Sequence, residues 1–381
     1  MDSKSLPRHY VPITRLLFVI LVACPPHVVL GENKSSNASF NSSDHMDEKE
    51  QDFIKWVARV GNQFYSGSYS GDQVGKNRLS GIKSVGYTLT VGKSGSGAQF
   101  LTVQDAVDAV PKHNSQRIII QIGPGIYKEK VHVPSSKPYI TFQGAGASST
   151  TITWHDTEAS TGALAKSASV SIDSRGFIAR DMTFENSASA PPIGSTDRQA
   201  VALMIAGDQA AFYNCNFVGH QDTLYDYKGR HYFEECLIQG SVDFICGNGQ
   251  SLYKKCELRT VLRSTQSLTA QKRAKPSENT GFSFVDCKVT GEGMAYLGRA
   301  WGPYSRVVFS YTYMDDIIKP QGWHNWDDSS REHKVFFGQY KCSGPGAEQS
   351  ERVGWSRELS DTEAAPFQSV SFIDGASWLE S

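Results

Sequence analysis

Short runs of alternating apolar and polar residues recur along most of the chain after residue 85. Each run is rich in aromatic and β-branched side chains and is bounded by Gly, Asn, Asp or Ser, which is the pattern of a β-strand. No helical period of useful length separates them. The clearest examples are FYNCNF, YFEECLI, LYKKCEL and FSFVDCKV, together with GFIARDMTF (176–184), RVVFSYTYM (306–314) and KVFFGQYKC (334–342).

The first four runs each carry a cysteine, at positions 215, 236, 256 and 287, and the first three cysteines are spaced by 21 and 20 residues. Equivalent strands at such intervals, too close to be joined by helices, are typical of a solenoid in which each strand stacks on its counterpart one turn later. We therefore predict an all-β fold, a right-handed parallel β-helix. Cys215, Cys236 and Cys256 would form a buried ladder of thiols rather than disulfides or a metal site. An antiparallel β-sandwich stays open as the alternative on pattern alone.

The segment FLTVQDAVDAVP follows a different period. Thr102, three residues before Asp105, suits a helix N-cap, and Pro111 suits the stop. The apolar positions at helical spacing are Val103, Ala106, Val107 and Val110. We predict a short helix that caps the N-terminal end of the solenoid, followed in RIIIQIGPGIYKEKVHV by a strand, a turn and a second strand.

The N-terminus carries basic residues ahead of the apolar run LLFVILVAC, which is too short to span a bilayer. This pattern predicts a signal peptide over residues 1–31 and a secreted protein; the alternative, a membrane anchor, is disfavoured by the prolines that follow. Glycosylation sequons begin at Asn33, Asn37 and Asn41. Residues 32–84 are predicted to be a variable, glycosylated extension and linker, with an amphipathic helix near 47–64, and residues 85–381 the β-helix domain.

The amino-acid composition limits the kinds of molecule that the protein is expected to bind. The chain has 381 residues, 39% of them hydrophobic, and its 34 glycines suit a folded, turn-rich protein. With 38 basic and 39 acidic residues the formal net charge is −1. Neither nucleic acid nor, after signal removal, a membrane is therefore expected as a partner, and we expect a monomer.

The interval of about 21 residues between equivalent strands predicts that Asp222 lies beside a second aspartate. Asp222, in GHQDTLYD, lies 21 residues before Asp243, in GSVDFICGNG, the same interval that separates Cys215 from Cys236. If these residues stack on adjacent turns, their carboxyl groups lie about 5 Å apart on the outer face. Like charges this close are not both comfortably ionised, so one Asp should keep a proton while the other stays anionic. A general acid beside a nucleophile or base requires this arrangement.

Two glutamines fall in the same region. Gln221 precedes Asp222, and Gln199 lies 22 residues earlier, about one turn. Amide groups donate hydrogen bonds, so they suit a developing oxyanion better than a cation. A solvated or Ca²⁺-binding Asp ladder stays open as the alternative, although calcium would favour further carboxylates in phase.

Other catalytic patterns are missing from the sequence. None of the ten histidines has metal-binding spacing, there is no GxSxG elbow, and GKSGSGAQF (92–100) lacks the ending of a phosphate loop. We therefore predict neither a metal site nor a cofactor, and an α/β-hydrolase esterase is not supported.

Five motifs stand in the order and approximate spacing of the pectin methylesterase family: GIYKE (125–129), QAVAL (199–203), GHQDTL (219–224), DFICGNG (243–249) and LGRAW (297–301). From about Val85 to near the C-terminus the chain resembles these carbohydrate esterases of plants and their pathogens. The resemblance implies a β-helix, in agreement with the repeat. It also implies a secreted cell-wall enzyme that removes methyl esters from the galacturonate units of pectin (homogalacturonan) and releases methanol.

The resemblance also implies roles for the matching residues. Asp243 would be the nucleophile, and Asp222 would protonate the departing methoxide and then deprotonate the hydrolytic water. Arg299 would hydrogen-bond Asp243 and keep it ionised. Gln199 and Gln221 would donate to the oxyanion, and substrate contacts would come from Trp301, Tyr225, Trp323 and Ser169.

Two positions depart from the family pattern. Cys246 stands where Phe is usual, and Ala300 where Pro is common, which affects the expected subsite preference rather than the reaction. The interval between Gly31 and Val85 is too short for the helical, inhibitor-like pro-region of about 150 residues found in many plant relatives, so we expect the short form. A proteinaceous pectinesterase inhibitor is a further expected partner.

Two other functional classes are weighed against the esterase. A retaining glycosidase on the same solenoid would also use two carboxylates about 5 Å apart, although it would leave the glutamine donors without a purpose. A non-catalytic pectin-binding protein is disfavoured because Asp222, Asp243 and Arg299 are all present.

Overall fold

The computed structural model describes residues 85–190, 198–261 and 265–379. The predicted signal peptide (1–31), the extension and linker (32–84) with its sequons, and the amphipathic helix near 47–64 all lie outside these residues. Within the described residues the strands form three sheets, called A, B and C here, and every strand pair is parallel. The predicted parallel β-helix is therefore confirmed, and the antiparallel sandwich is excluded.

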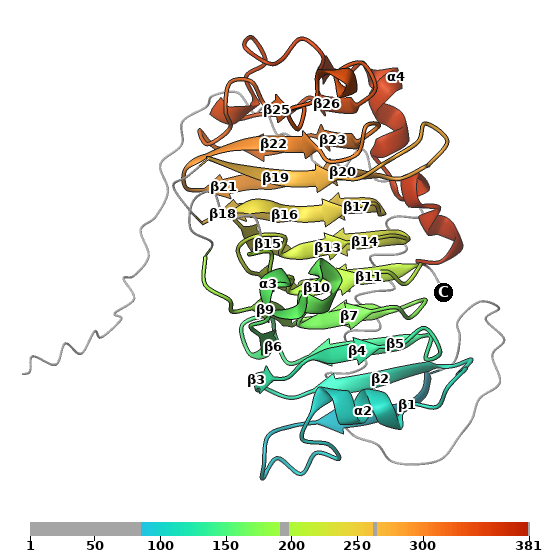
Figure 1. Cartoon of the computed structure of the whole chain (residues 1–381). Helices are drawn as coiled ribbons and strands as arrows, with labels where there is room; N and C mark the ends of the chain where they lie inside the picture. The colour runs from blue at the N-terminus through green and yellow to red at the C-terminus, as the bar shows by residue number, and fades with distance from the viewer. Residues whose placement is uncertain (1–84, 191–197, 262–264, 380–381) are drawn as a thin grey trace, which may run out of the picture. The chain divides into compact units, whose positions relative to one another are not determined.

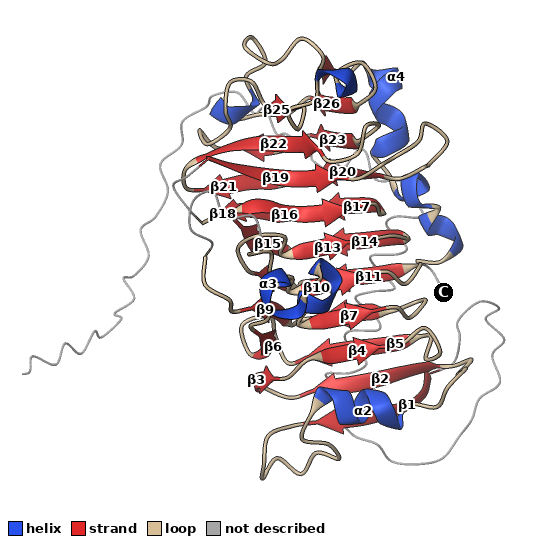
Figure 2. Cartoon of the chain, in the orientation of Figure 1, coloured by secondary structure: helices blue, strands red, loops and turns tan. Residues whose placement is uncertain are grey.

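Eight successive turns of the chain each contribute one strand to every sheet, and β1, β26 and β27 extend sheet A alone (Figures 1 and 2). Sheet A contains, in order, β1 (Val85–Val91), β2 (Arg117–Ile122), β5 (Ile140–Gly144), β8 (Ile178–Arg180), β11 (Ala210–Tyr213), β14 (Arg230–Glu234), β17 (Gln250–Lys254), β20 (Gly281–Val285), β23 (Arg306–Ser310), β26 (Phe336–Tyr340) and β27 (Arg357–Glu358). Sheet B contains β3 (Gly125–Lys128), β6 (Thr150–Trp154), β9 (Thr183–Asn186), β12 (Asn216–Val218), β15 (Leu237–Gly240), β18 (Glu257–Thr260), β21 (Lys288–Gly291) and β24 (Tyr313–Met314). Sheet C contains β4 (Val131–Val133), β7 (Val170–Ile172), β10 (Leu203–Ile205), β13 (Leu224–Asp226), β16 (Val242–Gly247), β19 (Thr265–Gln271), β22 (Met294–Ala300) and β25 (Trp323–His324).

Six of the seven runs that the sequence predicts as single strands divide between sheets A and B, whereas KVFFGQYKC contains only β26 of sheet A. In 176–184, for example, β8 ends at Arg180 and β9 begins at Thr183, with a corner between them. The first corner residue has a left-handed backbone although it is not glycine, which costs roughly 1–2 kcal/mol per residue. The corner residues are Asp181, Asn214, Glu235, Lys255, Asp286, Tyr311 and Lys341, with φ between 48° and 54°. Asp181, Asn214 and Asp286 are of types that adopt this conformation more readily than most, but Glu235, Lys255, Tyr311 and Lys341 are not, so residue type does not mark the corners consistently.

The repeated cysteines lie directly after four of these corners. Cys215, Cys236, Cys256 and Cys287 are buried free thiols, so the predicted interior ladder is confirmed. Each thiol donates to the carbonyl two residues earlier, at sulfur–oxygen distances of 3.3–3.4 Å. A small side chain with a weak donor therefore fits the inner side of a corner, which explains the spacing of the cysteines.

Aromatic rings stack in register along the inner face of sheet A. Phe233 lies between Phe212 and Tyr253, with ring centroids 4.8 Å and 4.5 Å away, and the stack continues through Phe284 and Phe309. All five side chains are fully buried. The stack links five successive turns of the solenoid.

Phe233→Ala should destabilise the fold by about 3–5 kcal/mol, because the change leaves a cavity between two rings that cannot close without shifting adjacent strands. Urea unfolding measures the loss. Tyr87→Ala, at a side chain that is 42% exposed, is the control and should change the free energy of unfolding by no more than about 0.5 kcal/mol. Equal losses of unfolding free energy in the two variants would show that the aromatic stack does not stabilise the fold.

Most helical segments lie near the two ends and along one side of the solenoid, whereas α3 (Glu158–Thr161) lies over its middle (Figure 2). The predicted capping helix is α2 (Val103–Ala109), in which Thr102 accepts from the Asp105 backbone N–H, and it packs against β1, β2 and β4. Near the C-terminus, α4 (Asp361–Ala364), η4 (Ala365–Phe367), η5 (Val370–Ile373) and η6 (Gly375–Ser377) follow one another, with η2 (Ser329–Arg331) and η3 (Pro345–Ala347) before them. Ser283 of β20 donates to the Phe367 carbonyl at 2.5 Å, and η5 contacts β17, so this segment covers part of sheet A.

The predicted strand–turn–strand over RIIIQIGPGIYKEKVHV is three strands, β2, β3 and β4. The chain therefore turns twice here, once at Gly123–Pro124 and once after Lys128, and enters all three sheets within one turn.

Candidate active site

The outer face of sheet C carries a ladder of residues in register that is distinct from the core. Its members are Met204, Tyr225, Cys246, Ala270 and Arg299, one from each of β10, β13, β16, β19 and β22. Their neighbours along the strands, such as Leu203, Leu224 and Ile245, belong to the interior core, whereas the first four ladder residues form a separate apolar cluster. We call this outer surface the site face.

Asp222 and Asp243 occupy equivalent positions on adjacent turns. The Asp222 backbone N–H donates to the Val242 carbonyl at 3.1 Å, and Gln221 bridges to Val242. Both aspartates have left-handed backbones, with φ of 59° and 49°. Neighbouring strands lie about 4.8 Å apart, so the repeat correctly placed the two residues side by side.

Asp243 is held by charged and polar donors. Arg299 donates through Nε to Oδ1 at 3.0 Å and through Nη2 to Oδ2, and the Ser267 hydroxyl donates to Oδ1. Arg299 lies on β22, two strands beyond the strand β16 that carries Asp243. Ala270 on the intervening strand β19 has only a methyl side chain, so the guanidinium can reach across it to Asp243. Burial lowers the pKa of Arg299, but the Asp243 charge and hydrogen bonds outweigh it and raise the pKa overall. Both carboxylate oxygens therefore face donors, which suits an anion.

Asp222 is in a different electrostatic state. Its side chain is buried, 8% exposed, and burial together with the neighbouring Asp243 charge raises its pKa well above the ordinary value. Arg299 and a hydrogen bond with Cys246 act in the opposite direction but are weaker. The pair therefore combines a carboxyl group that retains its proton with a carboxylate held by an arginine.

The two glutamines come from adjacent turns, with Gln221 directly before Asp222 in the chain and Gln199 on the preceding turn. The Ala200 N–H donates to the Gln221 carbonyl at 3.0 Å, so Gln199 and Gln221 lie on neighbouring segments, and both side chains are half-buried. The structure thus brings together Gln199, Gln221, Asp222, Asp243 and Arg299.

Aromatic rings flank the site. Trp301 and Trp326 are nearly parallel, with centroids 6.5 Å apart, and both pack against the site-face cluster. The Arg299 guanidinium lies 4.3 Å from the Trp326 ring centroid, and the Lys272 ammonium lies 4.1 Å from that of Trp301. Tyr225 also lies on the site face, although it is only 6% exposed.

Two predicted substrate contacts are wrong. Trp323 is 2% exposed and points into the core, where its ring stacks on Phe337 with centroids 4.5 Å apart. Ser169 is completely buried just before β7. Ala300 is also fully buried in the core, so this departure from the family pattern affects interior packing, whereas Cys246 lies on the site face.

Sequence reasoning missed Ser267 and Trp326. Ser267 lies 24 rather than 21 residues after Asp243, so the repeat interval does not find it. Trp326 lies in the loop after β25, three residues after Trp323. The alternation of side chains between the two faces near the end of this strand was the one available indication that the Trp326 ring lies on the outer face.

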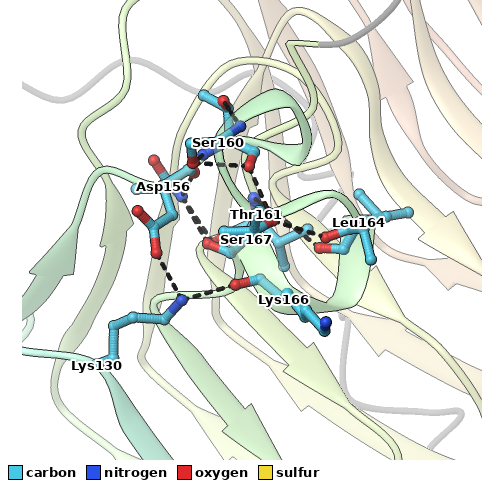
Figure 3. A network of polar contacts seen from close by, with 11 residues as sticks. Lys130, Asp156, Ser160, Thr161, Leu164, Lys166 and Ser167 are labelled. Atoms are coloured by element: carbon cyan, nitrogen blue, oxygen red, sulfur yellow. Dashed lines mark hydrogen bonds and ion pairs between the residues drawn. The ribbon is translucent and has the colours of Figure 1, made fainter.

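One loop between β6 and β7 lies beside the site. It contains α3 (Glu158–Thr161) and η1 (Leu164–Ser167), and Leu164 packs against the site-face cluster. The Lys130 ammonium group stabilises this loop by donating to the Asp156 carboxylate and to the Lys166 carbonyl oxygen, both at 2.7 Å (Figure 3). The Glu158 N–H donates to the Gln199 carbonyl at 2.8 Å, so this loop also fixes the backbone beside Gln199.

Metal-binding geometry is lacking in the described part of the chain: no group of three or more His, Cys, Asp or Glu is placed to hold an ion. The cation beside Asp243 is instead the Arg299 guanidinium, which contacts both carboxylate oxygens. This contact argues against the calcium-binding interpretation of the two aspartates.

The fold and the site define a hydrolase with two aspartates in different electrostatic states on the outer face of a parallel β-helix. The family model for pectinesterase matches residues 88–376. Pectinesterase QRT1 of Arabidopsis thaliana is 48% identical over 311 residues, covering 80% of this chain and 81% of the relative. Pectinesterase 31 of the same plant is 45% identical over 300 residues, covering 75% and 92%. Among solved structures, the pectin methylesterase from carrot is 35% identical with a TM-score of 0.73, covering 80% of this chain and 97% of that one.

The chain belongs to the pectinesterase family. It is a carboxylic ester hydrolase that removes methyl esters from pectin, as the sequence motifs predicted.

Proposed function

We propose that Asp243 is the nucleophile and Asp222 the general acid and base of this esterase. The difference between the two carboxyl groups carries the proposal: Asp243 accepts two hydrogen bonds from Arg299 and one from Ser267, whereas Asp222 is buried beside that charge with a raised pKa. A carboxylate nucleophile next to a protonated carboxyl group is what a double displacement needs.

In the first step, a carboxylate oxygen of Asp243 attacks the methyl-ester carbonyl of a galacturonate unit. The tetrahedral intermediate collapses as the carbon–oxygen bond to methoxide breaks, and Asp222 gives its proton to methoxide, which leaves as methanol. In the second step, Asp222, now a carboxylate, takes a proton from water. The resulting hydroxide attacks the acyl group, the bond to Asp243 breaks so that Asp243 leaves as a carboxylate, and the galacturonic acid that forms gives its proton to solvent.

Gln199 and Gln221 are proposed to donate from their side-chain amides to the oxyanion of each tetrahedral intermediate. Support comes from their placement on neighbouring segments next to the two aspartates. Loss of one such donor typically costs about 3 kcal/mol of transition-state stabilisation.

The substrate is proposed to lie across the site face, with sugar rings against Trp301, Trp326 and Tyr225. Their rings lie beside Arg299 and Cys246 and supply flat apolar surface next to the reacting groups. A pectin methylesterase that is 26% identical to this chain has been solved in complex with a hexasaccharide, which supports binding of an extended chain of sugars.

Export to the plant cell wall, by a signal peptide over residues 1–31, is also proposed. Support comes from the N-terminal charge pattern and from the plant relatives. Among the residues that the structure describes, no helix is both long and apolar enough to cross a bilayer. A monomer and a proteinaceous inhibitor as partner stay predictions.

The reaction is tested with methylated homogalacturonan as substrate. We expect methanol and acid in a one-to-one ratio with no new reducing ends, because the ester bond and not the glycosidic bond is cleaved. Homogalacturonan without methyl esters is the control and should give neither product. New reducing ends would instead support the glycosidase interpretation, and binding without any product would support the non-catalytic one.

A further inference from the structure

Lys272 places a positive charge at the edge of the site face. It directly follows β19, and its ammonium lies 4.1 Å from the ring centroid of Trp301, which directly follows β22. Trp301 packs against the site-face cluster and is nearly parallel to Trp326. No step of the proposed reaction uses the Lys272 charge, although it lies beside a ring that is proposed to contact the sugar.

The backbone that carries Lys272 is firmly held. The Lys272 N–H donates to the Gly247 carbonyl at 2.8 Å. The residues on either side of it in the chain, Gln271 and Arg273, are 0% and 7% exposed. The Arg273 guanidinium donates to three backbone carbonyls at 2.6–3.1 Å. Lys272 is therefore an exposed residue between two buried ones, and the fold sets its position beside Trp301.

The charge of Lys272 is not neutralised by another side chain. In the described part of the chain its ammonium contacts the Trp301 ring and forms no ion pair with an acidic residue. By contrast, the Lys130 ammonium lies 2.7 Å from a carboxylate oxygen of Asp156. An ammonium over an aromatic ring at an exposed site is held only weakly. An incoming carboxylate can therefore draw the Lys272 side chain off the ring and bind it.

We propose that Lys272 is a specificity-determining residue that binds the carboxylate of an unesterified galacturonate unit, next to the unit whose methyl ester is cleaved. The inference rests on the proposed placement of sugar rings against Trp301. Trp301 lies two residues beyond Arg299, which binds Asp243, so a sugar on Trp301 belongs to a unit beside the reacting one. A methyl-esterified unit is neutral there, so the ammonium distinguishes the two forms.

Lys272→Gln removes the charge and keeps a polar side chain of similar size. The first substrate is a hexagalacturonate with one methyl ester flanked by free carboxylates. For this substrate we expect KM to rise about three- to tenfold with kcat unchanged, because a charge-assisted contact with the bound chain is lost. For the fully methyl-esterified hexamer we expect KM to stay unchanged. Methanol release measures both, and added salt should narrow the difference between the unchanged enzyme and the variant.

Two variants serve as controls. Lys272→Arg keeps the charge and should hold KM for the first hexamer within about twofold of the unchanged enzyme. Lys288→Gln removes an equal charge from an exposed side chain on β21 of sheet B and should leave both KM values unchanged. This second control separates a local contact from a change in net charge, and thermal midpoints report folding for every variant.

Equal changes of KM on the two hexamers in Lys272→Gln, or no change on either, would overturn the inference. So would a rise of the same size in Lys288→Gln, since net charge would then be the cause. Trp301→Ala tests the proposed substrate path separately and should raise KM for both hexamers. If Trp301→Ala raises neither, the sugar does not lie on Trp301 and the placement fails. If it raises both while Lys272→Gln changes neither, only the inference about Lys272 fails.

Discussion

Replacing Asp243 with asparagine is expected to reduce kcat/KM for methylated homogalacturonan by about 10⁴-fold or more. The amide is not a nucleophile, and it cannot accept the paired hydrogen bonds of Arg299 as an anion does. The loss should lie mainly in kcat, because the aromatic side chains that would contact the sugar are unchanged. Methanol release under steady-state conditions measures it, and Asp243→Ala guards against slow conversion of the new asparagine back to aspartate.

Asp327→Asn is the matched control for this substitution. Asp327 acts on the same arginine by its charge, but its side chain is 94% exposed and it contacts His324 rather than Arg299. We expect the kcat/KM of Asp327→Asn to stay within about twofold of that of the unchanged enzyme, because an exposed charge is screened by solvent. Asp243 variants that keep several per cent of the activity while folding normally would refute the nucleophile assignment.

Replacing Asp222 with asparagine should reduce kcat/KM by about 10²- to 10⁴-fold, because asparagine cannot pass a proton to methoxide. The pH dependence should change as well. Burial and the Asp243 charge raise the pKa of Asp222, so the protonated form needed for the first step persists to higher pH and is lost as pH rises through that raised value. This loss produces the alkaline limb of kcat/KM, and the limb should be missing from Asp222→Asn.

The same substitution should stabilise the fold. A carboxyl group whose pKa is raised on folding contributes stability that is fully present below its unfolded pKa, about 3.9, and is lost as pH rises through the folded value. Asparagine does not ionise, so Asp222→Asn should have a higher thermal midpoint than the unchanged enzyme at and above the raised pKa. Near pH 3 the two midpoints should converge. A lower midpoint at all pH values would contradict the electrostatic state assigned to Asp222.

The pairing of Asp222 with Asp243 could be predicted from the sequence because this turn of the solenoid has no insertion, so the interval read from Cys215 and Cys236 also applies to the acids. The corners could not be predicted, since left-handed backbones at Glu235, Lys255 or Tyr311 have no compositional signal. Stacking on adjacent turns, and not the local residue type, stabilises these conformations.

The aromatic contacts show a second limit. Trp323 and Trp326 are three residues apart at the end of the short strand β25, and one faces the core while the other lies beside Arg299. Side-chain alternation over a two-residue strand is too short to decide which face each ring occupies. The sequence alone therefore does not show that Trp323 lies in the core and that Trp326 lies on the site face.

The architecture is repetitive, whereas its chemistry is not. Five consecutive turns each contribute a different part, through Gln199, Asp222, Asp243, Ser267 and Arg299. Duplicating or deleting one turn inside this window would preserve stacking but shift the arginine by a whole strand spacing away from its aspartate. Under the proposed mechanism, a change in the number of turns is therefore compatible with activity only outside the five turns that carry these residues.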